Sequence, residues 1–444
     1  MKKVLIITYY WPPAGGPGVQ RVLKFAKYLP QFGWQPIILT VANGDYPAID
    51  ETLKKDISEE CIVYKTNSLE PNNIYKKFTG MKKDEKIPVA VLSDKKIGWK
   101  KKIAKWIRLN LFIPDAKIGW IPFAVKKGKK IINELQPDII FSSSPPPTVH
   151  LIAKKLSNWS GLKWVADFRD PWTDIHYYED NYRNYFVESI DLRLEKNVLK
   201  KADKITCISQ KDIEMDFGKK VKNSKCINIP NGFDESDFLN IADTKDTNDK
   251  FKLIHLGAIN KERLPINLFK SIRKMDKEKI INPDNFILSL IGKVTPCVIK
   301  MVEELKIQNY VEFISYLPHN QAVGKGMGAS ILLLLITQSE RNIRILPGKT
   351  FEYLRMGKPV LGLGPENGEV ARIINETKTG KIIEYNDVQA IYKYLKMFFN
   401  NWNESKNKFK IPKQVISKYS RENLTRKIAN VFNEIIKKVN YEDK

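Results

Sequence analysis

Short apolar runs rich in β-branched residues recur along this chain, each bounded by turn residues and followed by a segment long enough for a helix. In the first half they are VLIIT at 4, PIILT at 36, DIIFSSS at 138, WVADF at 164, KITCIS at 204 and CINIPN at 226. Continuous apolar strands that alternate with helices form parallel sheets covered on both faces. The pattern therefore predicts a doubly wound α/β domain.

A second series of the same kind predicts a second domain of the same class. Its members are FKLIHLG at 251, FILSLIG at 286, VEFISYL at 311, ILLLLI at 331 and PVLGLG at 359. A chain of 444 residues is also too long for one ordinary core. We predict an α/β fold of two tandem Rossmann-like domains: residues 1–232, a linker over 233–250, and residues 251–418. Residues 419–444 have helical apolar spacing and are predicted to form an amphipathic helix, which could cross back to the first domain.

Composition limits the partners and the location. The formal net charge of +25 indicates an anionic partner: a nucleic acid, an acidic bilayer or a phosphorylated small molecule. The four cysteines are far apart and have no C-x-x-C pair, which favours a reducing cytoplasm and no zinc site. The apolar run at the start is short for a signal peptide, and no stretch reaches the roughly 18 to 20 apolar residues of a membrane-spanning helix.

The first motif is the glycine-rich stretch TYYWPPAGGPG, which follows the first predicted strand. Ligands of open α/β sheets bind outside the carboxyl ends of the strands, so we expect the site in a cleft between the two domains. Gly15, Gly16 and Gly18 do not form a dinucleotide fingerprint, because Arg21 replaces the last glycine. A bare-backbone loop before a helix can accept a phosphate or a sugar hydroxyl. The alternative is a tight turn that needs positive φ.

The second motif is LPGKTFEYLRMGKPVLGLG, at residues 346–364. It predicts a short helix from about Thr350 to Met356, with Lys349 at its entrance and Glu352 in its first turn. Helix N–H groups and an ammonium together can neutralise a diphosphate, and a carboxylate can accept hydrogen bonds from a ribose diol. Alternatively, Glu352 complements the helix dipole and Lys349 is solvated.

These motifs resemble those of the retaining family 4 glycosyltransferases, which have the two-Rossmann GT-B architecture. The resemblance runs from Lys3 to about Asn430. It is carried by four stretches: Pro12-Pro13-x-Gly15-Gly16, Asn231-Gly232-Phe233-Asp234, HLGAINKER after the linker, and PGKTFEYLRMGKPVL.

The resemblance implies roles for individual residues. In this family the first loop approaches acceptor and donor sugar, which corresponds to Gly15 and Gly16. Two glutamates spaced E-x7-E contact the donor sugar and the ribose; Glu352 matches the second, but Arg344 stands at the first. This departure puts the sugar identity in doubt.

A basic pair that holds the donor diphosphate is also altered in this chain. After Gly257 the expected arginine is Ala258, and the expected lysine is Arg263, with Lys261 close by. Arginine can bind phosphate in a bidentate manner, so Arg263 is the preferred ligand. The implied donor-binding residues are Gly15, Gly16, Gly257, Lys261, Arg263, Gly348, Lys349, Thr350 and Glu352.

The third constellation is WVADFRDPWTD at residues 164–174, again at the end of a predicted strand. Asp167, Arg169 and Asp170 could orient an acceptor hydroxyl, or a carboxylate could act as a base. The alternative is an Arg–Asp pair that fixes the loop. The family often places a histidine in this region, which makes His150 a weaker candidate beside the favoured Asp170.

The reaction that the resemblance implies is displacement of a nucleoside diphosphate from the anomeric carbon with retained configuration. Fixed cations at the departing phosphate would supply most of the stabilisation of the transition state. The residues expected to be catalytic are Arg263, Glu352 and Asp170. No D-x-D metal signature is present, so we expect no metal and no cofactor besides the nucleotide-sugar substrate.

The positive charge is concentrated between residues 76 and 130, with 17 Lys and Arg against 4 Asp and Glu. Within this insertion, WKKKIAKWIRLNLF at 99–112 places Trp99 and Trp106 on an apolar face and lysines on the other. Such a helix suits the surface of an anionic membrane, and it would bring a glycan or lipid-linked acceptor of cell-surface polysaccharide synthesis to the inner face of the cell membrane. An ordinary surface helix is the alternative.

The sequence alone leaves two alternative functions open. A nucleic-acid-binding protein would also mix lysines with aromatic residues, but no nucleic-acid module is recognisable and the motifs gather at strand ends. A sugar-nucleotide epimerase, or a non-catalytic binder of the same architecture, is closer, because the first glutamate is missing.

Overall fold

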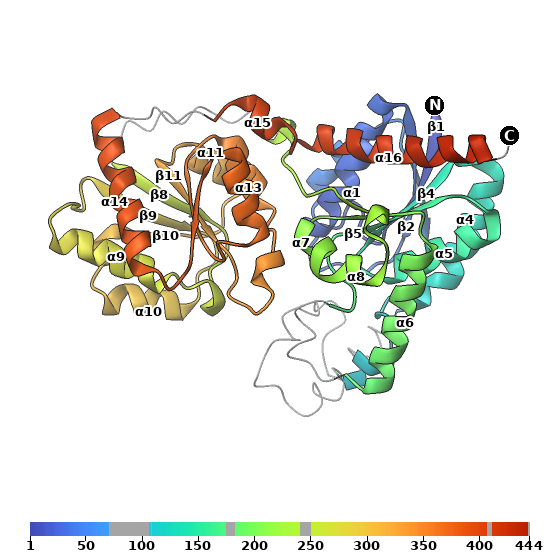
Figure 1. Ribbon diagram of the computed structural model, residues 1–444, viewed down its shortest axis with the longest axis horizontal. Coiled ribbons are helices and arrows are strands. Elements are labelled where there is room, and N and C mark those ends of the chain that lie inside the picture. Colours follow the sequence, from blue (N-terminus) through green and yellow to red (C-terminus); the bar gives the residue numbers. More distant parts are fainter. Residues whose placement is uncertain (71–105, 108, 175–182, 240–249, 406–410, 443–444) are drawn as a thin grey trace. The chain divides into compact units, whose positions relative to one another are not determined.

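The computed structural model describes residues 1–70, 106–107, 109–174, 183–239, 250–405 and 411–442 (Figure 1). The chain forms two compact units. Unit 1 is Met1–Pro230 with Arg421–Lys444, and unit 2 is Asn231–Ser420. The boundary lies at Pro230/Asn231, just before the position that the sequence suggested.

Unit 1 is built on a parallel sheet whose described part has seven strands in the order β3-β2-β1-β4-β5-β6-β7. The strands are β1 (Lys2–Ile7), β2 (Trp34–Val41), β3 (Ile62–Thr66), β4 (Ile139–Ser144), β5 (Trp164–Phe168), β6 (Lys204–Cys207) and β7 (Cys226–Asn228). The six apolar runs predicted in this half all form strands. In β1, Val4 and Ile6 pack on one face and Leu5 and Ile7 on the other, because successive side chains of a strand alternate.

Helices cover both faces of this sheet. They are α1 (Pro17–Tyr28), α4 (Ile121–Leu135), α5 (Thr148–Ser160), α6 (Tyr185–Lys201), α7 (Gln210–Asp212), α8 (Gly218–Lys220) and α16 (Arg421–Glu442). A π-helix spans Ile213–Phe217, and 3₁₀ turns lie at Leu29–Phe32, Glu51–Asp56, Ile118–Trp120 and Asn223–Lys225.

The C-terminal helix α16 belongs to unit 1 although it follows unit 2 in the sequence. Figure 1 shows it beside α1. Phe432 meets the rings of Trp34 and Phe141 at centroid distances of 5.2 and 5.6 Å, and Leu424 and Ile428 join the same core. Burying each of these side chains contributes about 1.5–3 kcal/mol, so the helix is an integral part of this unit.

Unit 2 has a parallel sheet whose described part has six strands in the order β10-β9-β8-β11-β12-β13. They are β8 (Phe251–Leu256), β9 (Phe286–Ile291), β10 (Val311–Ile314), β11 (Ile331–Leu335), β12 (Val360–Leu363) and β13 (Gly380–Ile383). Its helices are α9 (Ile266–Lys277), α10 (Pro296–Glu304), α11 (His319–Met327), α12 (Lys349–Met356), α13 (Glu369–Thr377), α14 (Val388–Ser405) and α15 (Lys413–Ser417). Further 3₁₀ turns are Glu235–Phe238, Lys261–Arg263, Gln308–Tyr310 and Asn342–Arg344.

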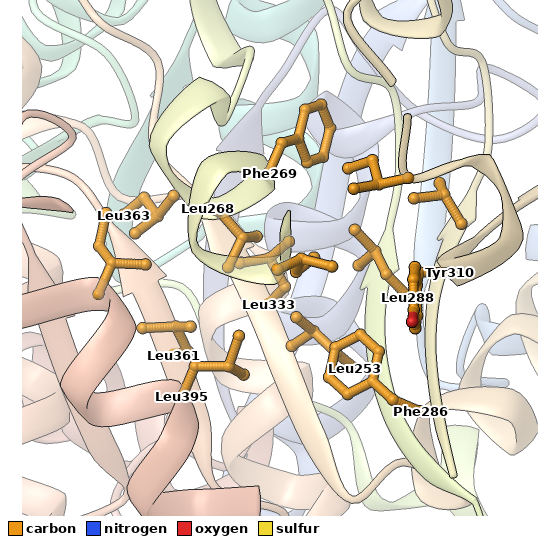
Figure 2. Packing of buried hydrophobic residues seen from close by; sticks show 14 of the residues in the cluster. Leu253, Leu268, Phe269, Phe286, Leu288, Tyr310, Leu333, Leu361, Leu363 and Leu395 are labelled. Atoms are coloured by element: carbon orange, nitrogen blue, oxygen red, sulfur yellow. The ribbon is translucent and has the colours of Figure 1, made fainter. Parts of the chain in front are cut away.

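The core of unit 2 lies on both faces of this sheet. Figure 2 shows one face, where Leu253, Leu288 and Leu333 of the strands meet Leu268 of α9 and Leu395 of α14. A second cluster on the opposite face contains Ile254, Leu332 and Leu354. The prediction of two Rossmann-like domains with helix-covered parallel sheets is therefore confirmed.

The sheet of unit 2 opens between β8 and β11, where the strand order changes direction. Leu253 and Ile254 pair with β11, but beyond them the Tyr353 hydroxyl bridges the two strands. It accepts a hydrogen bond from the Leu256 N–H at 2.9 Å and donates to the Leu333 carbonyl at 3.3 Å. Such a switch point is where open α/β sheets bind ligands.

Candidate functional site

The carboxyl end of β8 places a lysine directly over a glycine. Gly257 has a φ of 128°, and a Cβ atom built there would lie 1.5 Å from the Lys349 Nζ. Lys349 is the first residue of α12, so the start of this helix meets the end of the central strand. Any side chain at position 257 would displace the ammonium. Glycine is therefore favoured here by its backbone conformation, and its missing side chain leaves room for the Lys349 ammonium.

A second glycine extends this bare surface to the neighbouring strand. Gly292 follows β9 with a φ of 131°, and a Cβ there would lie 2.8 Å from the carbonyl carbon and oxygen of Gly257. The Gly257 N–H donates to the Ile291 carbonyl at 2.7 Å, which fixes the two strand ends side by side. The sequence analysis did not single out Gly292, although the glycine that ends the FILSLIG run was a usable signal.

Arg263 is anchored beside the same strand ends. Its Nε donates to the Thr337 hydroxyl at 2.9 Å, just beyond β11, and its Nη1 approaches the Ala258 carbonyl at 3.5 Å. The 3₁₀ turn Lys261–Arg263 carries this side chain. Lys261, in the same turn, is exposed. Arg263 is thus held in place by the protein, whereas Lys261 lies at the surface.

Burial and their mutual charges change the pKa values of these residues. Burial, helped by the charge of Arg263 and opposed by Glu352, lowers the pKa of Lys349 to about 8. Burial and the charges of Lys349 and Arg263 also lower the pKa of His255 to about 3, against a hydrogen bond with the Leu333 carbonyl. A neutral His255 therefore lies near two cations. An anionic ligand would favour the charged form of Lys349, which this environment disfavours.

The remaining residues predicted in this unit differ in accessibility. Glu352 keeps 31% of its side chain exposed, and its Oε1 lies 3.2 Å from the Nε2 of His319. Thr350 is fully buried, and its hydroxyl has no hydrogen-bond partner in the described part of the chain. The Thr350 side chain is therefore closed to solvent at the start of α12, and its contact with a donor stays a prediction. Gly348 is the N-cap of α12, and Arg344 is buried.

In unit 1, the three glycines of the first loop have different local surroundings. A Cβ on Gly15 would lie 3.1 Å from the Asp50 Cβ, and the Gly15 N–H donates to the Ala48 carbonyl at 2.8 Å. Gly16 has a φ of 89°, and a Cβ on Gly18 would lie 2.8 Å from Arg169 Nη1. The positive φ of Gly16 favours glycine, and Gly15 packs closely on Asp50. The contact of Gly15 and Gly16 with donor or acceptor stays a prediction.

Asp167, predicted to contact the acceptor, is buried in the core of unit 1. Arg21 binds it through two hydrogen bonds of 2.7 and 2.9 Å, and Ser143 and Thr206 each donate at 2.6 Å. Burial alone would raise the pKa of Asp167, but Arg21 and the two hydroxyls outweigh it and hold the pKa below its usual range. The prediction for Asp167 is corrected to a structural role, because this carboxylate is buried and already occupied.

His150 is likewise inaccessible. Its Nδ1 lies 2.8 Å from the Ser142 hydroxyl, which also accepts a hydrogen bond from Trp164 Nε1 at 2.8 Å. Its ring packs 4.3 Å from that of Phe168, and burial lowers its pKa to about 3. The first turn of α5 directs His150 into the core, so the expected contact with an acceptor is corrected: His150 is a neutral packing residue.

Asp170 differs from these two residues because it is accessible. It lies just beyond β5 with 39% of its side chain exposed, and it pairs with Arg169 at 3.1 Å. The Arg169 N–H donates to the Ser144 carbonyl at 3.2 Å, which ties this loop to β4. Asp170 is thus an accessible carboxylate at the carboxyl edge of this sheet, and Arg169 is its ion-pair partner.

Only part of the predicted basic helix falls on described residues. Trp99 lies outside them, and Trp106 is 48% exposed in a short helical segment. Leu109 and Asn110 are buried, and the Asn110 Oδ1 accepts a hydrogen bond from the Asn184 N–H at 2.7 Å. This end of the segment therefore packs against the start of α6 and exposes only some of its residues.

The described residues were also searched for metal sites, membrane-spanning helices and cavities. They contain no group of three or more His, Cys, Asp and Glu side chains arranged to hold a metal ion. Across the same residues, every helix is too short or too polar to cross a membrane. A hollow of about 580 Å³ in unit 1 is lined by the lysine-rich segment 219–225 and Lys200, and it contains none of the predicted site residues.

Comparisons with known proteins agree with this fold. Residues 94–237 match the family model Glycosyltransferase Family 4, and residues 238–413 match Glycosyl transferases group 1. A search of curated protein sequences found no match. Among solved structures, sucrose-phosphate synthase from Thermosynechococcus elongatus is similar with a TM-score of 0.65 and 14% identity, over 98% of this chain and 99% of that one.

Two further structures have similar values. A glycosyltransferase from Rickettsia africae has a TM-score of 0.61 at 17% identity, covering 98% of this chain and 99% of that one. HepE from Anabaena, solved in complex with UDP and glucose, has a TM-score of 0.58 at 13% identity, covering 98% and 100%. The two adjoining family models and the shared fold show that this chain is a glycosyltransferase of the GT-B type.

Proposed function

We propose that this glycosyltransferase moves a sugar from a nucleotide-sugar donor, with retention of configuration, to a glycan or lipid-linked acceptor in cell-surface polysaccharide synthesis. The observation that carries the proposal is Lys349 lying over the bare backbone of Gly257, near Arg263 and Glu352. A partly desolvated cation at the start of a helix, beside a second fixed cation, suits a diphosphate. The complex of HepE with UDP and glucose supports a nucleotide-sugar donor.

The residues of this chain divide the chemistry as follows. Negative charge develops on the departing diphosphate, so Arg263 and Lys349 stabilise the transition state where the charge grows. Glu352 accepts hydrogen bonds from the ribose hydroxyls and fixes the nucleoside. Asp170 of unit 1 orients the acceptor hydroxyl, which attacks from the face of the leaving group. In this mechanism the protein supplies no covalent nucleophile and uses no metal ion.

We further propose that the protein works at the cytoplasmic face of the cell membrane. The 17 Lys and Arg between residues 76 and 130, against 4 acidic residues, favour an anionic leaflet as partner, and Trp106 offers an exposed indole. A lipid-linked acceptor would then reach the enzyme from the bilayer. Sedimentation with vesicles of anionic and of neutral lipids measures this association, and equal binding to both would remove the electrostatic basis.

A sugar-nucleotide epimerase is the second candidate, because Arg344 occupies the position of the glutamate that contacts the donor sugar. Incubation with a panel of sugar nucleotides, with and without membrane lipid extract, separates the candidates. Release of nucleoside diphosphate that depends on lipid supports the transferase, and sugar interconversion without an acceptor supports the epimerase. A protein that acts on none of the donors, and binds none in calorimetry, would contradict the proposal.

The site residues are tested in the same assay. Glu352→Ala should weaken donor binding without unfolding unit 2, because its side chain is partly exposed. Asp170→Asn should lower turnover while donor affinity is retained, because Asp170 acts on the acceptor in this mechanism. Unchanged donor affinity in Glu352→Ala would exclude Glu352 as a ligand.

A further inference from the structure

Glu352 is contacted by a residue that the sequence analysis did not identify. His319 is the first residue of α11, and its Nε2 lies 3.2 Å from Glu352 Oε1. The two side chains are 55% and 31% exposed, so each can be approached from solvent. The contact joins the first turns of two helices that lie far apart in the sequence.

The core of unit 2 sets the geometry of this contact. A Cβ on Gly326 would lie 2.6 Å from the Met356 sulfur, so the glycine lets the side chain of Met356 in α12 pack closely on α11. Val323 of α11 and Leu354 of α12 are buried in the same cluster. His319 and Glu352 are therefore in contact because the core packing of α11 and α12 places their first turns side by side. A contact between two long side chains on independent surface elements would lack this support.

In this pair, His319 is the hydrogen-bond donor and Glu352 the acceptor. An ionised carboxylate only accepts hydrogen bonds, so the histidine Nε2 must carry the proton and donate. This bond uses one of about four acceptor positions of the carboxylate, which leaves Oε2 and part of Oε1 for other donors. It also restricts the rotamers of Glu352, whose ordering would otherwise cost free energy when a ligand binds.

We propose that His319 is a positioning residue that holds the Glu352 carboxylate ready to accept hydrogen bonds from the ribose hydroxyls of the donor. This inference rests on the proposed function, because it takes Glu352 as the ribose ligand. Lys349, on the same turn of α12, interacts with Glu352 and would hold the diphosphate. The contribution of His319 to binding is therefore specific to the ribose diol and separate from recognition of the phosphates.

A pair of ligands isolates this contribution. UDP, GDP and ADP are titrated against the full chain by calorimetry, and the tightest is compared with its 2′,3′-dideoxy analogue, which keeps base and phosphates. His319→Ala should weaken binding of the ribose form about fivefold to tenfold, as expected for the net contribution of one ordinary hydrogen bond. The dideoxy form should change less than twofold. His319→Gln retains a donor and should restore most of the affinity.

Two controls distinguish positioning from a structural effect. Gln321→Ala alters an exposed residue of the same helix and should leave both ligands unchanged. In a Glu352→Ala background, His319→Ala should have no further effect, because its partner is gone. The inference is overturned if His319→Ala weakens both ligands equally, weakens neither, or adds its full effect to Glu352→Ala. A wild-type chain that binds none of the three nucleotides would instead overturn the proposed function, and this inference with it.

Discussion

The carboxyl edges of the two sheets carry similar residue types but use them differently. In unit 1, Asp167 is bound by Arg21 and two hydroxyls, and His150 is bound by Ser142. In unit 2, burial and, after it, the charge of Arg263 lower the pKa of Lys349. Unit 1 neutralises the Asp167 carboxylate internally, whereas unit 2 holds two like charges, Lys349 and Arg263, that an anion would stabilise.

The largest expected effect tests the structural role of Asp167. Asp167→Ala leaves Arg21 buried without its carboxylate, and breaking a buried pair in this way costs about 3–5 kcal/mol. Urea unfolding followed by a probe in unit 1 should show this loss. Asp170→Ala is the matched control, because Asp170 is partly exposed and surface changes stay within about 0.5 kcal/mol. Equal stability of the two variants would contradict the distinction between these carboxylates.

The Asp167 pair also predicts the response to acid. The pKa of this carboxyl is lower in the folded chain than its usual value, so its stabilisation is full at neutral pH. It is lost as the pH falls below the ordinary value of 3.8 and through the folded pKa. Acid unfolding of the wild type and of Asp167→Asn checks this: the variant should lack this part of the pH dependence. A parallel loss of stability in both proteins would show that other groups control it.

The next largest effect concerns the cations of unit 2. Lys349→Met should weaken binding of a nucleoside diphosphate by about 1.5–3 kcal/mol, or roughly tenfold to a hundredfold, because a charge-assisted contact is lost. Calorimetry measures the affinity, and Lys261→Met serves as the control because Lys261 is exposed at the end of the neighbouring turn. If the two variants bind equally well, the exposed lysine and the partly buried one contribute alike, and the proposed geometry fails.

A smaller effect follows from the lowered pKa of Lys349. Its ammonium is protonated below about pH 8 and loses its proton above this value, so affinity for a diphosphate should fall as the pH rises through it. Bound diphosphate raises the pKa of Lys349, which moves the midpoint of the complex to higher pH. Affinity measured from pH 7 to 10 checks the prediction. Lys349→Arg should remove the dependence, since arginine stays charged over this range.

The smallest effect is expected at His150. His150→Phe removes one buried hydrogen bond but keeps an aromatic ring beside Phe168, so the stability should fall by about 1 kcal/mol. Turnover per folded molecule should remain as in the wild type. A large loss of turnover at unchanged stability would show that His150 takes part in the reaction after all.

Much of the fold could be predicted because the inner strands of both sheets are buried on both faces and therefore apolar throughout. The two strands that the sequence analysis missed, β3 and β13, lie at the edges of their sheets. Their residues are partly exposed, and their runs are correspondingly less uniform in polarity. The helix predicted from about Thr350 matches α12, since flanking glycines and a proline delimit it in the sequence.

The candidate site could be predicted only in part. Gly257, Arg263, Lys349 and Glu352 lie near one another as the motif spacing and the family resemblance suggested. His319 was missed because its contact with Glu352 links residues 33 positions apart, and no local pattern records it. Asp167, near the end of β5, and His150, in the first turn of α5, were misassigned because a polar residue at such a position can point either into the core or toward solvent.

The sequence by itself determined the two α/β units, the helix of residues 421–442 and the set of charged residues near the strand ends, since these depend on local periodicity and on the chemistry of side chains. Only the tertiary structure decided which of these charges are neutralised by a partner and which lie near a charge of the same sign. That outcome depends on packing between elements that are remote in the chain, as with Arg21 and Asp167 or Gly257 and Lys349.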